Sequence, residues 1–299
     1  MLKGLAITPP VVGRVSIGRM VERNGKRLPE KDDQFTLTSQ VQNREGWVLH
    51  PLDEELRKDA GGKLRAIPVR MLFNDPALNL RADYSMFDRT TGRPLCVGNG
   101  ETCRRAGSDG IESLPCPSPD ACSFAMGDCK PYARLNVVIG DEDAMGTFVL
   151  RTTSYNTIRT LTARLNYFNA VSGGLLACMP LTLKLRGKST AMSFRTAIYY
   201  VDLVVRAGMT LEEAITHAGR LDESRREAGF IQVALDEAAR KGFAAGGFEE
   251  LAEDSPSVAE EFYPEMDQMQ QAETPHATTS NLHSRLEQKV ERLGGVAVG

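Results

Sequence analysis

Five of the six cysteines fall within one stretch of 34 residues, and no other feature constrains the fold of this chain as strongly. They are spaced as Cys96-x6-Cys103-x12-Cys116-x5-Cys122-x6-Cys129. The residues between them are rich in Gly, Pro, Ser and Asp, so the segment can bury little apolar surface and needs another source of order. A metal ion held by thiolates supplies that order, and tetrahedral sulfur ligation favours zinc.

Disulfide bonds are the competing explanation for clustered cysteines, and they are typical of exported proteins. The first residues lack the long apolar run of a signal peptide, and Pro9-Pro10 interrupts them. No apolar stretch is long enough to cross a bilayer, so we expect a cytoplasmic chain with reduced thiols and no membrane partner. The metal interpretation is therefore preferred.

Five thiolates exceed the four ligands of a closed zinc site. The compact run of Cys116, Cys122 and Cys129 supplies three, and spacing alone does not choose between Cys96 and Cys103 for the fourth. No histidine lies between His50 and His217, which favours a structural site over a catalytic one. An iron–sulfur cluster also uses four cysteines and is the alternative cofactor. The sixth, Cys178, lies among apolar residues and is expected in the core.

Charge is unevenly distributed, although the net value is only −3. Between Gly242 and Ser284 there are nine acidic residues and no Lys or Arg, which predicts a solvated tail. The rest of the chain is mildly basic. Candidate contacts with a nucleic acid or a protein partner lie in and after the cysteine stretch, because cations can hold phosphates and an aromatic ring can stack on a base. They are Arg104, Arg105, Lys130, Tyr132 and Arg134.

Alternating apolar and polar residues predict strands in most of the first 209 residues. We expect them within 12–50 and at 65–73, 82–88, 133–139, 146–152, 180–189 and 193–206, with Gly92 in a hairpin turn. Helical spacing after the N-cap Ser154 predicts a helix that ends at Gly173-Gly174. A capping box at Thr210–Glu213 starts two more helices, near 211–226 and 230–241.

These patterns predict an α+β fold with a mainly antiparallel β body. The expected organisation is a body at 1–209 with an inserted cysteine-ligated zinc module at 96–129, helices at 210–245, a disordered acidic linker at 246–280 and a short terminal helix at 281–299.

Three motifs occur in order in the body: GRVSIGRMVERNGKRLPEKDDQFTLTS, PLCVGNGETCRR followed by PCPSPDACSFAMGDCKPYARLNVVI, and TFVLRTTSYNTIRTLTARL. Together they resemble the recombination directionality factor-like family of phages and integrative elements, over roughly residues 12–205. The resemblance implies that Cys96, Cys116, Cys122 and Cys129 occupy the family's cysteine positions, which favours Cys96 over Cys103.

The resemblance implies a non-enzymatic factor of site-specific DNA recombination that contacts a serine integrase and biases it towards excision. The first alternative is a zinc-containing nucleic-acid-binding protein of a mobile element, with DNA as the partner. The second is a metal-dependent hydrolase, but the four scattered histidines form no ligand spacing, and there is no nucleophile elbow, P-loop or H-E-x-x-H motif.

Overall fold

The computed structural model describes residues 10–23, 26–43, 46–140, 146–189, 197–242, 258, 262 and 263, with side chains left out for 19–32. The chain divides into two compact units, Met1–Phe262 and Tyr263–Gly299. Every helix and strand described here belongs to the first unit. Apart from residues 258, 262 and 263, the predicted acidic linker and terminal helix lie outside the described residues.

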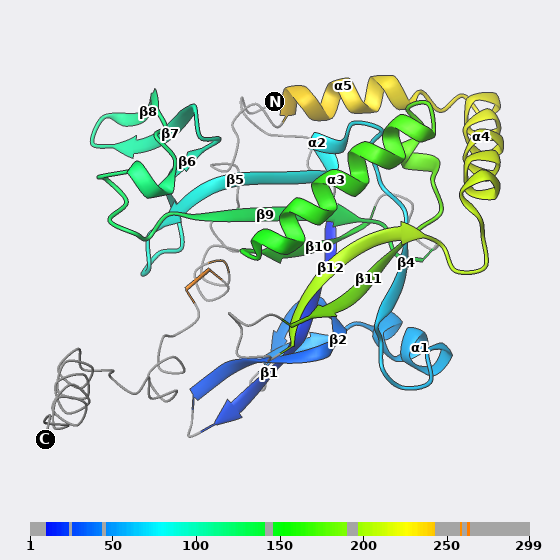
Figure 1. Ribbon diagram of the computed structural model, residues 1–299, viewed down its shortest axis with the longest axis horizontal. Helices are drawn as coiled ribbons and strands as arrows, with labels where there is room; N and C mark the ends of the chain where they lie inside the picture. Colours follow the sequence, from blue (N-terminus) through cyan, green and yellow to red (C-terminus); the bar gives the residue numbers. More distant parts are fainter. Residues whose placement is uncertain are drawn as a thin grey trace, which may run out of the picture. The chain divides into compact units, whose positions relative to one another are not determined.

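A nine-stranded sheet dominates the first unit (Figure 1), in the order β3-β2-β1-β10-β9-β5-β6-β7-β8. Its strands are β1 (Val11–Arg23), β2 (Lys26–Asn43), β3 (Gly46–Leu49), β5 (Leu80–Phe87), β6 (Pro94–Gly98), β7 (Thr102–Gly107), β8 (Gly110–Pro115), β9 (Lys130–Val137) and β10 (Thr147–Thr152). All neighbours pair antiparallel except β1 and β10, which run parallel. The predicted α+β class with a mainly antiparallel sheet is confirmed.

A smaller antiparallel sheet has the order β12-β11-β4. Its strands are β4 (Ala66–Val69), β11 (Leu181–Lys188) and β12 (Ile198–Val205). The strands predicted at 180–189 and 193–206 are present as β11 and β12, although residues 193–196 lie outside the described part. On β11, Leu181, Leu183 and Leu185 are buried while Lys184 is exposed, so the strict alternation places one leucine face in the core.

Five helices complete the described part: α1 (Pro51–Asp59), α2 (Pro76–Asn79), α3 (Tyr155–Val171), α4 (Leu211–Glu227) and α5 (Gln232–Gly242), besides the 3-10 turns η1 (Pro119–Ala121) and η2 (Leu176–Cys178). The backbone N–H of Thr157 donates to Ser154 Oγ at 3.4 Å, which confirms the predicted cap of α3. The predicted capping box of α4 is also present. Helices α1 and α2 were not predicted.

The core lies between one face of the large sheet, the small sheet and α3, which crosses the strands in Figure 1. Leu135 of β9, Leu150 of β10 and Leu161 and Leu165 of α3 are all fully or almost fully buried within it. Cys178 is 3% exposed in the same core, as predicted. Ala133 and Val137 of β9 also belong to this core. Because successive residues of a strand point to opposite faces, the β9 residues that alternate with Ala133, Leu135 and Val137 face away from α3.

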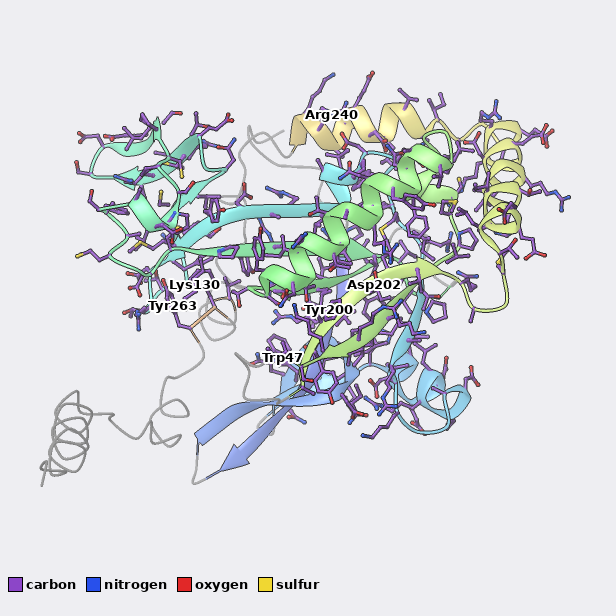
Figure 2. The ribbon with its side chains drawn as sticks, viewed as in Figure 1. Trp47, Lys130, Tyr200, Asp202, Arg240 and Tyr263 are labelled. Carbon is purple, nitrogen blue, oxygen red and sulfur yellow. The ribbon has the colours of Figure 1, made fainter. Side chains whose placement is uncertain are left out.

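Asp202 on β12 is a buried charge that joins this strand to its neighbours (Figure 2). Arg164 Nε of α3 and Arg186 Nε of β11 donate to its two carboxylate oxygens at 3.0 and 2.6 Å. Burial raises the pKa of Asp202, but the hydrogen bonds from Arg186 and Arg164 outweigh it, so the pKa lies below its ordinary value. The carboxylate is therefore ionised at neutral pH and holds α3, β11 and β12 together.

Candidate functional site

All five clustered cysteines line one small cavity beside the end of the large sheet. Cys96 lies on β6 and Cys103 on β7, Cys116 directly follows β8, Cys122 ends the turn η1, and Cys129 directly precedes β9. The cavity is about 10 Å³, which is room for one water-sized sphere. The structure thus brings together the five thiols that the sequence analysis grouped.

Two hairpins carry the first three cysteines to this position. Strands β5 and β6 pair through the turn at Gly92, where φ is 66°, as predicted. No strand was predicted between Cys103 and Cys116, but this run forms the β7–β8 hairpin and extends the sheet. The sheet therefore contributes to the order of this segment, in addition to any bound metal.

Gly98 permits the close approach of these strands. A Cβ atom at this position would lie 2.6 Å from Cys103 Cβ and 3.0 Å from Cys116 Sγ. Real Cβ atoms do not approach so closely, so glycine is required where two of the cysteines converge.

The loop from Cys116 to Cys129 has an unusual backbone. In the described part of the chain, the non-glycine residues with a left-handed φ are Ser118 at 67° and Met126 at 45°, and both belong to this loop. Such conformations are costly for L-residues and persist only where the surroundings hold them. This loop positions Cys122 and Cys129 against the two hairpins.

The thiols influence one another electrostatically. Burial and a hydrogen bond with Cys96 raise the pKa of Cys103 to about 11. Burial and the neighbouring thiolates raise the pKa of Cys129 to about 11 as well. Without a cation, several thiolates this close together repel one another, and a bound divalent ion removes that repulsion.

All six cysteines are free thiols, and no three or more Cys, His, Asp or Glu side chains in the described ranges stand at metal-ligand geometry. A zinc ion at about 2.3 Å from each sulfur would need the thiols to turn towards the cavity. The cavity that the five thiols line lies between them.

Four of the five predicted contact residues lie together on the opposite face of the sheet. Lys130, Tyr132 and Arg134 alternate along β9 and share the face that points away from α3. Lys130 is in register with Ser85, Ser85 with Val97, and Val97 with Arg104, which places Arg104 on the same face.

Further arginines on that face were not predicted as contacts. Arg134 is in register with Arg81 on β5 and with Arg151 on β10, so three arginines cross three adjacent strands. We call Arg81, Arg104, Lys130, Arg134 and Arg151 the basic face. Asp83 lies among them. Burial raises its pKa above the ordinary value against the opposing effect of Arg81 and Arg134.

Arg105 does not belong to the basic face, although it was grouped with Arg104. Its guanidinium lies 3.8 Å from the centroid of the Phe124 ring and lines the cysteine cavity. Burial lowers its pKa, but a hydrogen bond with Cys96 and the nearby thiolates raise it more, so that the net shift is upward. Because side chains alternate along β7, Arg105 and Arg104 lie on opposite faces of the sheet.

Tyr132 is only 4% exposed, because other aromatic rings enclose it. Its ring makes edge contacts with Phe87 at 5.2 Å and with Phe262 at 5.8 Å between centroids. The ring is therefore closed to stacking on a base while Phe262 is in place. Sequence reasoning missed Phe262 because the surrounding composition is that of a solvated segment.

The model of the Gp3-like family, described as recombination directionality factor-like, matches residues 12–206. The chain belongs to this family. Membership ties it to DNA recombination in phages and mobile elements, and implies contact with the recombination machinery. The family description names no catalytic activity. No curated protein and no solved structure matches the chain.

The matched span contains the cysteine cavity and the whole basic face, whereas α4 and α5 lie beyond it. No helix in the described part of the chain combines the length and apolar character needed to cross a bilayer.

Proposed function

We propose that this chain is an accessory factor of site-specific recombination that binds a serine integrase and biases it towards excision. The family match over residues 12–206 carries the proposal, because this span holds both candidate surfaces. We propose that the factor works in the cytoplasm through protein contact and performs no catalytic step itself.

The cysteine cavity supports a structural zinc ion as part of this proposal. Cys116, Cys122 and Cys129 with Cys96 or Cys103 would form a closed tetrahedral site, which contributes folding energy but no open coordination position. The cavity of about 10 Å³ suits a single ion better than an iron–sulfur cluster. A zinc ion at this site would join strands β6, β7 and β8 to the start of β9.

A zinc-containing nucleic-acid-binding protein is the second candidate, and the basic face favours it. Five cations on one face of the sheet could neutralise phosphates, in which case the affinity for DNA would fall steeply with salt. The two candidates differ in whether the chain binds DNA without an integrase.

The test is an excision assay with any serine integrase whose gene adjoins this reading frame in its genome. We expect the purified chain to stimulate recombination between the two product attachment sites and to inhibit the integration reaction. A gel-shift assay should show it retarding integrase–DNA complexes but not the same DNA alone. Salt-sensitive binding to bare DNA, with no effect on the integrase, would instead establish the second candidate.

Replacing Cys122 by serine should remove the metal. The wild-type chain is expected to carry about one zinc ion, because binding to a structural thiolate site is tight. In Cys122→Ser we expect zinc loss and rapid proteolysis near residues 97–130, while the β body stays folded. Elemental analysis and mass mapping of the cleavage products measure both effects.

Cys178→Ser is the matched control, since this thiol lies in the main core and outside the cavity. It should keep its zinc. A Cys122→Ser chain that retains both zinc and protease resistance would show that the proposed site is wrong. Comparing Cys96→Ser with Cys103→Ser would then identify the fourth ligand.

A further inference from the structure

Phe262 is buried on the basic face, far along the chain from the strands it contacts. Its ring lies edge-on to Phe87 at 4.8 Å and to Tyr132 at 5.8 Å between centroids, and it is 1% exposed. Lys130 Nζ lies 5.4 Å from the same ring centroid and 3.5 Å from the carbonyl oxygen of Phe262. Lys130 is labelled at the start of β9 in Figure 2. Aromatic, cationic and hydrogen-bonding contacts therefore converge on one residue.

A second buried apolar residue lies four residues earlier in the sequence. Val258 is fully buried, like Phe262. Glu260 and Glu261 stand between the two in the sequence, and nine acidic residues lie between Gly242 and Ser284 with no Lys or Arg. We call residues 255–265 the anchor segment. Phe262, an apolar residue of an acidic sequence, is thus seated on the basic face.

The composition of the cage favours a protein segment over a nucleic acid. A base stacks flat on an exposed aromatic ring. Phe87 and Tyr132, which are 3% and 4% exposed with Phe262 in place, instead meet its ring in edge contacts with interplanar angles of 70° and 71°. Such a cage accepts an inserted phenyl side chain, which is an anchor that proteins can supply.

The contact is also of a kind that can open. A few buried side chains provide modest stabilisation compared with a strand inside the sheet, and such contacts are at the low-stability end of a fold. A tethered segment holds its site through a high effective concentration, so a competing segment on a bound partner can replace it.

We propose that the cage of Phe87, Tyr132 and Lys130 is a docking site for acidic protein segments with an aromatic anchor. Phe262 of the chain itself occupies this site. A protein partner that carries a segment of the same chemistry displaces it. This inference rests on the proposed function, because the integrase is the partner expected to supply that segment.

The test uses a fluorescent peptide of residues 255–265 added to the full-length chain. Fluorescence anisotropy should show weak binding to the wild-type chain, whose cage is filled. Phe262→Ala empties the cage and should bind the peptide at least about tenfold more tightly, because the fraction of chains competent to bind rises. A peptide with Phe262→Ala, or with Glu260 and Glu261 both changed to Gln, should bind at least about tenfold more weakly.

Tyr155→Ala is the matched control, since this exposed tyrosine is on α3, across the sheet from the basic face. It should leave peptide affinity at the wild-type value. A measurement that needs no variant is limited proteolysis of the wild-type chain. Excess peptide should speed cleavage near residue 262, whereas the Phe262→Ala peptide should not.

Equal peptide affinities for the wild-type and Phe262→Ala chains, with no change in proteolysis, would overturn the inference. So would a gain in duplex-DNA binding by Phe262→Ala without a gain in peptide binding, because the segment would then be screening a nucleic-acid surface. The excision assay is independent of both readouts. Stimulated excision with a failed peptide test would refute only the docking site.

Discussion

Asp202→Ala is expected to lower the free energy of unfolding by about 3 kcal/mol. The carboxylate is 2% exposed and accepts hydrogen bonds from arginines on α3 and β11. Its removal leaves both guanidiniums without their shared partner at the junction of three elements. This loss of unfolding free energy lies at the low end of the range for broken buried ion pairs, because the Arg164 and Arg186 side chains are 43% and 41% exposed. Urea denaturation at pH 7 measures it.

The difference in unfolding free energy between the wild-type and Asp202→Ala chains should depend on pH. The pKa of Asp202 is lowered in the folded state, so the ionised group contributes stability above its unfolded pKa of about 3.9. That contribution is lost as the pH falls through the folded value. The difference between the wild-type and Asp202→Ala chains should therefore shrink below about pH 4.

Asp222→Ala is the control for this prediction, because Asp222 forms an ion pair at 2.9 Å within α4 with Arg226, whose side chain is 69% exposed. It should change stability by less than about 1 kcal/mol. Equal losses of unfolding free energy in Asp202→Ala and Asp222→Ala would mean that the ion pairs of Asp202 stabilise the fold no more than the pair within α4.

Asp53→Ala should have a similarly large effect, about 3 kcal/mol. Asp53 Oδ1 accepts from the backbone N–H of Leu37 at 2.8 Å, and Asp53 Oδ2 accepts from Arg57 Nε at 2.6 Å. Arg57 Nη2 in turn donates to the carbonyl oxygen of Phe35 at 2.6 Å. Without the carboxylate, the buried N–H of Leu37 loses its acceptor, and Arg57 loses the partner that holds its guanidinium against β2.

Glu54→Ala tests whether burial is the cause. Glu54 pairs with Lys58 on the same helix, but both side chains are largely exposed, at 77% and 70%. Thermal unfolding should barely change in this variant. A marked fall in the unfolding temperature of Glu54→Ala, or no fall for Asp53→Ala, would contradict the proposed role of the Asp53 network.

Elements with strong local signals could be predicted from the sequence. The α3 helix begins after Ser154 and is followed by two glycines with left-handed φ, at Gly173 and Gly174. The capping box of α4 and the alternating leucines of β11 are equally local. Helix α1 had such signals too, with His50 as the cap, Pro51 in the first turn and Asp53 after it, and these were overlooked.

The site could be predicted only in part. Its cysteines lie close together in the sequence, whereas each face of the sheet brings together residues that are far apart in the sequence. Clustering along the chain was enough to group the five thiols around one cavity. The separation of Arg104 from Arg105 depends on the β7–β8 hairpin, which the Gly-rich and Ser-rich composition obscured. The row of Arg81, Arg134 and Arg151 depends on strand register, and the seating of Phe262 depends on a contact across most of the chain.

The parallel pairing of β1 with β10 has a consequence for how this chain is made. Val11 is in register with Thr147, so the first hairpin cannot reach its neighbour in the sheet until β10 has left the ribosome. Long-range pairing of this kind slows folding and leaves strand edges open meanwhile. During synthesis, the edge of β1 that pairs with β10 therefore stays without this partner until most of the first 150 residues have been made.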